Sequence, residues 1–136
     1  MKKGILALAM ASALLALPVA ASGDALRAQG ADDFQISFTL KSRDGEPTAL
    51  KRFKFSKLDT PCATGPLIQA RGRLPFIEVN DRNRFSDSLR RAGRQVRVKG
   101  RVSGNLNVVR GTIRAQGRFS PTARNCDSGK VKWVAR

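Results

Sequence analysis

The chain has 136 residues, with 26 lysines and arginines against 10 aspartates and glutamates, which gives a formal net charge of +16. This length fits one small domain. The chain contains no histidine, which excludes Ser-His-Asp and Cys-His catalysis and any imidazole metal site. The strong positive charge favours polyanionic partners over cationic ones.

The N-terminus has the pattern of a secretory signal peptide. A basic start at Lys2 and Lys3 precedes an apolar run over residues 5–17, which ends in small residues. That run is too short to span a bilayer, and no later stretch approaches the roughly 18 apolar residues that suggest a membrane helix. A retained anchor helix is the alternative. We predict a signal peptide over residues 1–21, cleavage after Ala21, no transmembrane segment in the mature chain, and a secreted or periplasmic (cell-envelope) protein.

The two cysteines, Cys62 and Cys126, are predicted to form one disulfide, because an exported chain with two cysteines most simply carries one bridge. Each begins a Cys-x-x-Gly segment, which is typical of a turn. A redox pair or a metal pair is the alternative. However, Cys-x-x-Gly is not Cys-x-x-Cys, and two thiols without histidine make a poor zinc site. We predict no metal and no cofactor.

The mature chain shows the period-two alternation of β-strands and almost no helical pattern. Residues 22–32 are small and polar and are predicted to form a flexible tail, followed by a β domain over residues 33–136. The first strand is predicted over residues 33–41, where apolar and polar positions alternate cleanly. Its apolar face carries Phe34, Ile36, Phe38 and Leu40.

The middle of the chain carries weaker strand signals. A turn at Asp44-Gly45 has the residues that positive φ angles require. Pro75 separates two apolar segments, because a central strand would not tolerate proline. Residues 82–94 are the most charged and least patterned, and Phe85 is the residue that we expect to be buried there. Strands are predicted over residues 50–58, 67–74 and 76–79.

The clearest pattern is a hairpin in the last third of the chain. Residues 95–102 and 109–119 each place apolar or glycine residues on one face and mostly basic side chains on the other, around a turn at 104–107. Matching the apolar faces pairs Val102 with Val109, Val98 with Ile113, Gly100 with Gly111, Arg101 with Arg110 and Arg97 with Arg114. The facing glycines would leave room for Trp133. We predict an all-β fold, a single-domain antiparallel β-sandwich or barrel of seven or eight strands stapled by one disulfide.

This register places like charges directly opposite each other on the outer face of the hairpin. Such pairs destabilise a sheet, so a face that accepts this cost is a candidate site for anions. The alternative is a face without function, because codon bias in a GC-rich genome produces arginine and exposed strand faces are commonly charged. The candidate binding residues are Arg97, Lys99, Arg101, Arg110, Arg114 and Arg118.

The residues show no catalytic constellation. A glycosidase would need two carboxylates that act as acid and base, and the candidates all fall in or beside turns, where turn and cap roles explain them. The phosphate-loop and nucleic-acid-binding patterns do not occur. We predict a non-catalytic protein with no specific nucleic-acid target. The carboxylate candidates are Glu46, Glu78, Asp59, Asp81, Asp87 and Asp127.

Several short motifs follow one another from Phe53 onward. They are Phe53-x-Phe55, Cys62-x-x-Gly65, Phe85-Ser86, Gly100, Gly111 and the ending Cys126-x-x-Gly129-x-Val131-x-Trp133-x-Ala135. In these motifs the chain resembles a group of small secreted bacterial proteins of unassigned function. The resemblance implies a β-rich exported domain and provides no catalytic or binding residues. This chain departs from the group in its arginine-rich segment over residues 82–118.

Together, charge, export and fold predict an envelope or extracellular binding module whose basic face meets anionic polymers, such as wall or capsule polyanions. A protein-interaction module, an adaptor or inhibitor for an acidic partner protein, is the alternative. A carboxylate-based hydrolase is the third reading.

Overall fold

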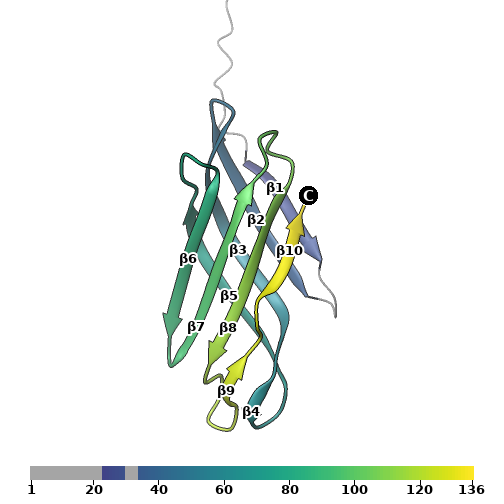
Figure 1. The fold of residues 1–136 in the computed structure, drawn as a ribbon, viewed down its shortest axis with the longest axis vertical. Helices are drawn as coiled ribbons and strands as arrows, with labels where there is room; N and C mark the ends of the chain where they lie inside the picture. Colours follow the sequence, from purple (N-terminus) through teal and green to yellow (C-terminus); the bar gives the residue numbers. More distant parts are fainter. Residues whose placement is uncertain (1–22, 30–33) are drawn as a thin grey trace, which may run out of the picture.

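The computed structural model describes residues 23–29 and 34–136. Within these residues the chain is all-β, with two antiparallel sheets packed face to face (Figure 1). No helix in the described ranges is long and apolar enough to cross a membrane. The predicted signal peptide over residues 1–21 lies outside the described residues. The strands are β1 (Gly23–Gln29), β2 (Gln35–Arg43), β3 (Glu46–Thr60), β4 (Cys62–Thr64), β5 (Ile68–Glu78), β6 (Arg84–Arg91), β7 (Arg94–Val102), β8 (Val109–Gly117), β9 (Arg124–Asp127) and β10 (Val131–Ala135).

The two sheets divide the chain roughly in half. Sheet A has the strand order β1-β2-β3-β5, and sheet B has the order β4-β9-β8-β7-β6 with β10 also paired to β8. The sheets approach each other at both edges. The Arg136 N–H donates to the Arg27 carbonyl at 3.3 Å beside β10 and β1, and Val79 forms a β-bridge with Phe85 where β5 leads into β6. The predicted all-β antiparallel fold with one disulfide is confirmed, and the packing of its two sheets is sandwich-like.

The β7–β8 hairpin has the predicted register. The structure pairs Val102 with Val109, Val98 with Ile113, Gly100 with Gly111, Arg101 with Arg110 and Arg97 with Arg114. The predicted turn at Asp44-Gly45 is also present, with positive φ angles of 52° and 77°. A second turn of this type, at Ala92-Gly93, has φ angles of 51° and 78° and joins β6 to β7. Two-residue turns of this kind match the twist of the strands that they connect.

Trp133 of β10 fills the space between the sheets. Its ring centroid lies 5.8 Å from those of Phe38 and Phe53 in sheet A and 6.1 Å from that of Phe85 in sheet B. A Cβ on Gly111 would come within 2.6 Å of Cζ2 of Trp133. The prediction that glycine leaves room for this ring is therefore confirmed.

Two bulges in β3 keep its apolar side chains inside the sandwich. Relative to β2, strand β3 has an extra residue at Arg52, and relative to β5 it has one at Lys57. Both residues have positive φ, 53° and 55°. Each bulge shifts the alternation by one residue, so apolar residues that are not spaced by two still face the core. The large buried side chains of β3 are Leu50, Phe53, Phe55 and Leu58.

The flexible tail predicted over residues 22–32 is wrong for Gly23–Gln29, which form β1. This strand pairs along its length with β2, and it buries Leu26 and Ala28. Its signal in the sequence is weak because Leu26 is its one large apolar residue. The rest of the predicted tail, residues 22 and 30–32, lies outside the described residues.

Three strand boundaries also differ from the prediction. Strand β5 continues through Pro75, because β5 is the outermost strand of sheet A and the missing N–H interrupts no ladder on that side. Residues 82–94 contain β6, an edge strand with mostly exposed side chains, and Phe85 is buried there as predicted. Strand β8 ends at Gly117, where φ is 118°, rather than at Phe119.

The predicted disulfide joins Cys62 to Cys126, which face each other across β4 and β9. It lies where the chain leaves sheet A and enters sheet B at Pro61. The Asp127 N–H donates to the Pro61 carbonyl at 2.9 Å beside it. A bridge over a sequence separation of 64 residues stabilises by about 4 kcal/mol when the entropy of the unfolded chain is considered.

We predict that Gly111→Ala destabilises the fold by about 1–3 kcal/mol, because the new methyl group would overlap the Trp133 ring and the Lys99 carbonyl. Gly104→Ala is the matched control, since a Cβ at Gly104 meets no atom within 4 Å. Free energies of unfolding from urea titrations measure both effects. Equal stability of the two variants would contradict the packing of Trp133 against β8.

Candidate functional site

The outer face of sheet B carries a row of three arginines. The register aligns Arg84 of β6 with Arg101 of β7, and Arg101 with Arg110 of β8, and Val134 of β10 comes next. Strands in such a ladder lie about 4.8 Å apart, and all three arginines are exposed. Arg84 points outward because its neighbour Phe85 points into the core. Like charges therefore stand side by side over three consecutive strands.

A second row lies two residues further along the strands and carries Lys99, Thr112 and Lys132. Between the two rows runs a groove of about 500 Å³ with the backbone of Gly100 and Gly111 at its floor. No carboxylate is among the residues that line it. We call this the sheet B groove. Its cationic side chains are those of Arg84, Lys99, Arg101, Arg110 and Lys132.

Arg114, one of the predicted binding residues, is engaged by Asp127. Its Nη2 lies 2.6 Å from one carboxylate oxygen of Asp127 and its Nε lies 3.0 Å from the other. The carboxylate also accepts hydrogen bonds from the Gly129 backbone N–H at 2.8 Å and from Nε2 of Gln116 at 3.3 Å. Hydrogen bonding to Arg114, helped by these donors, lowers the pKa of Asp127 to about 2. The same contact raises the pKa of Arg114.

Among the side chains of residues 34–136, this contact is the one ion pair. Arg84, Arg101 and Arg110 have no carboxylate partner within these residues. No direct ion pair therefore offsets the charge of these three arginines, whereas the charge of Arg114 is offset by Asp127. A charge that a carboxylate already holds in two hydrogen bonds is a weaker site for another anion.

The structure separates the six predicted binding residues. Lys99, Arg101 and Arg110 line the sheet B groove. Arg97 is exposed beside it, opposite the ion-paired Arg114. Arg118 follows the end of β8, where its backbone N–H donates to the Gly93 carbonyl at 3.2 Å. Eight residues beyond Arg110, it lies about 25 Å from the arginine row and is not part of the groove.

Sequence reasoning missed Arg84 and Lys132. Each immediately precedes an aromatic residue of the core, Phe85 and Trp133, and this spacing indicates that both basic side chains point outward. However, the alternation of apolar and polar residues indicates which face of the sheet a side chain occupies, but it does not identify the neighbouring strand. The pairings of β6 with β7 and of β10 with β8 bring these residues to the groove.

Comparisons with protein-family models, curated proteins and solved structures found no match to this chain. The resemblance to small secreted bacterial proteins stays a prediction.

We predict that Asp127→Asn removes an acid-sensitive contribution to stability. The pKa of Asp127 is about 2 in the folded protein, below its ordinary value of 3.8, so the unfolded chain takes up this proton more readily. The contribution is therefore present above about pH 4 and disappears as the pH falls toward 2. Denaturant unfolding between pH 7 and pH 2 should show a steeper decline in the wild type than in Asp127→Asn.

The control for this measurement is Asp44→Asn, which removes a carboxylate from the exposed β2–β3 turn. It should follow the wild-type profile. An Asp127→Asn profile parallel to that of the wild type would contradict the stabilising role of the Arg114–Asp127 contact.

Proposed function

We propose that this protein is an exported, non-catalytic binding module that associates with anionic polymers of the cell envelope through the sheet B groove. The observation that carries the proposal is the row formed by Arg84, Arg101 and Arg110, in a groove that no carboxylate lines. Guanidinium groups bind phosphate, sulfate and carboxylate through two parallel hydrogen bonds. A polymer with repeated anionic groups matches a repeated row of such donors.

The repulsion between neighbouring arginines in this row also supports a role in binding anions. Directly opposed like charges destabilise a sheet by about 0.2–1 kcal/mol, and the row contains two such neighbours, Arg84 with Arg101 and Arg101 with Arg110. An anion held between two guanidinium groups replaces this repulsion with attraction. Ligand binding would therefore stabilise the folded chain.

A polymer fits the groove better than an acidic protein partner does. Protein interfaces have an apolar core surrounded by polar residues, and such a core would need adjoining exposed apolar side chains. The large exposed apolar residues within the described ranges lie on different elements, and Val134 alone lines the groove. They are Leu67, Phe76, Leu89 and Val134.

The carboxylates do not favour hydrolysis at this groove. Acid–base hydrolysis of a glycoside needs two carboxylates that flank the substrate, and none lines the sheet B groove. The hollows that adjoin it at Arg84 and Lys99 have one carboxylate each, Glu78 and Asp87. A third carboxylate, Asp127, is held ionised by Arg114 with a pKa of about 2. A carboxylate with that pKa is a poor general acid near neutral pH.

Export is part of the proposal, and it is supported by the Cys62–Cys126 bond, since disulfides form and persist in oxidising compartments. We predict that the intact mass of protein recovered from outside the cytoplasm shows the loss of residues 1–21 and of two hydrogens from the cysteines. Alkylation before and after reduction tests the disulfide separately from the loss of residues 1–21. Free thiols on the folded, exported chain would contradict the disulfide, and a full-length mass would contradict processing.

We predict that Arg101→Gln/Arg110→Gln weakens binding to heparin and to double-stranded DNA, both used as model polyanions. On DNA, the dependence of log K on log salt should become shallower by about 0.9 for each phosphate that the variant no longer neutralises, or about two for the double variant. Stability without ligand should hold or rise by about 0.2–0.5 kcal/mol, because an opposed like-charge pair is relieved. Binding isotherms at several salt concentrations and urea titrations measure these effects.

The matched control is Arg43→Gln/Arg91→Gln, which removes the same charge from two exposed arginines that flank two-residue turns away from the groove. An equal decrease of affinity in both double variants would mean that only the net charge matters, and the groove assignment would fail. Capture of one acidic protein from envelope extract, without retention of heparin or DNA, would favour the adaptor alternative.

A further inference from the structure

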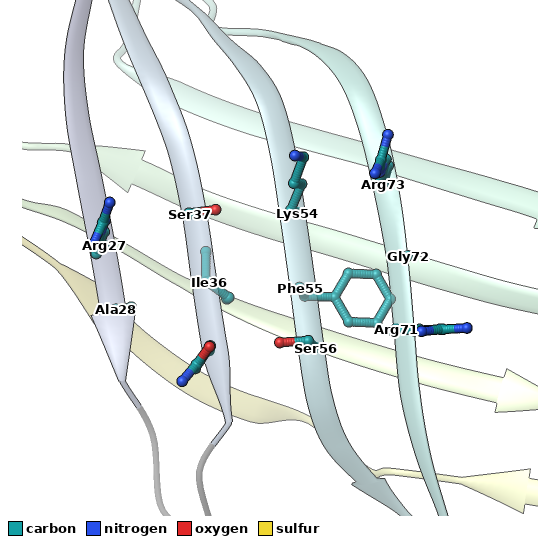
Figure 2. Close-up of a pocket in the computed structure, with 11 residues that line it drawn as sticks. Arg27, Ala28, Ile36, Ser37, Lys54, Phe55, Ser56, Arg71, Gly72 and Arg73 are labelled. Atoms are coloured by element: carbon teal, nitrogen blue, oxygen red, sulfur yellow. The ribbon is translucent and has the colours of Figure 1, made fainter.

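The outer face of sheet A carries a second basic groove. The register aligns Arg27 of β1 with Ser37 of β2, Ser37 with Lys54 of β3, and Lys54 with Arg73 of β5. Figure 2 shows these four residues in one line across the four strands, with Arg71 further along β5. The row therefore spans the whole width of sheet A.

This sheet A groove has a volume of about 570 Å³, and no carboxylate is among the residues that line it. Its polar lining side chains include Arg27, Ser37, Lys54, Ser56, Arg71 and Arg73. Adjacent strands place Lys54 and Arg73 about 4.8 Å apart at the backbone, and Arg27 lies two strands from Lys54, at about 10 Å. The hydroxyl groups between these cations can donate hydrogen bonds to anionic oxygens.

The floor of the sheet A groove is held by the core. The Phe55 ring packs against Gly72, where a Cβ would come within 2.9 Å of its Cε1. Gly72 is therefore fixed between Arg71 and Arg73, whose side chains alternate to the outer face. The basic side chains of this groove stand on packed strands rather than on a loop.

The two grooves face away from each other. The inner face of sheet A packs on sheet B through Phe38 and Phe53, which contact Trp133. The outer face of sheet A therefore points to the opposite side of the sandwich from the outer face of sheet B. Two packed sheets are about 10 Å apart, and outward side chains widen the distance between the two sets of cations.

We propose that the sheet A groove binds a second segment of the same class of anionic polymer, so that one protein molecule bridges two polymer chains. This inference rests on the proposed function of the sheet B groove. The occupant is a linear polymer that bears phosphate, sulfate or carboxylate groups, because the groove offers a cationic row across four strands and no apolar patch for a folded partner. Two separate cationic grooves on opposite faces suit cross-linking rather than tighter binding of one chain.

A stiff polyanion distinguishes the bridging of two polymer chains from the tighter binding of one chain. Double-stranded DNA has a persistence length of about 50 nm, so one short duplex cannot bend around a protein of this size and reach both faces. Bridging of duplexes then requires two molecules of DNA. The probe is a pair of short duplexes, one immobilised on beads and one fluorescent, and the measurement is the fluorescence captured as wild-type protein or a variant is added.

The test compares Lys54→Gln/Arg73→Gln, in the sheet A groove, with Arg101→Gln/Arg110→Gln and with the control Arg43→Gln/Arg91→Gln. We expect the sheet A variant to bind a single duplex within about threefold of the control and to capture the second duplex at least tenfold less well. Sedimentation shows whether each variant remains a monomer, and its unfolding midpoint shows that it is folded.

The outcomes separate this inference from the proposed function. Undiminished capture by the sheet A variant, whether as a monomer or through self-association, would overturn bridging and leave the sheet B groove untouched. An equal decrease of capture in the sheet A variant and the control would also overturn it. Undiminished capture of the second duplex by Arg101→Gln/Arg110→Gln would overturn the proposed function of the sheet B groove, because bridging needs both grooves.

Discussion

The packing of Trp133 between the two sheets is the contact on which the rest of the structure depends. Its ring touches phenylalanines of both sheets, and the facing pair Gly100 and Gly111 leaves the space that those rings occupy. Burial of a ring of this size stabilises by about 4–6 kcal/mol. The indole N–H has no hydrogen-bond partner among the described residues, which costs about 1–3 kcal/mol. The free energy gained by burying the ring therefore exceeds the cost of its unsatisfied N–H donor.

The same packing fixes where the charges point. Because Trp133 faces inward, its neighbours Lys132 and Val134 face outward. Gly100 also faces inward, so its neighbours Lys99 and Arg101 face outward. A slip of one residue in β7 would bring these cations into the core, which the sandwich cannot accept. The backbone positions of the basic rows are therefore set by the core beneath them, and no ion pair is needed to place them.

The sequence was most informative where the two faces of a strand differ sharply. Valines and basic residues alternate through β7 and β8, so one register alone buries the apolar side chains, and the structure confirms it. The β1 strand was missed because a single leucine carries its signal. The β6 strand was missed because an edge strand buries little. Both strands pair with the strand that follows them in the sequence, β1 with β2 and β6 with β7, but a weak alternation does not identify that pairing.

The sequence predicted only the part of the candidate site that lies within one hairpin. Arg101 and Arg110 face each other within one hairpin, so local register brings them together. Arg84 and Lys132 reach the groove from other elements, and Asp127 reaches Arg114 through the short pairing of β8 with β9. Those contacts depend on the arrangement of the whole sheet, whereas Arg118 is excluded by its distance along β8 from Arg110.

The spacing of the charges decides how the two basic faces influence each other. At physiological ionic strength the Debye length is about 8 Å, longer than the spacing of about 4.8 Å between neighbouring strands. Neighbours within one row therefore still repel, and a bound anion relieves that repulsion locally. The cations of opposite faces are separated by the sheet spacing of about 10 Å and by the outward reach of both side chains. Neutralisation of one face consequently acts more strongly on neighbours in the same row than on the cations of the opposite face, and each groove retains its own attraction for a polyanion.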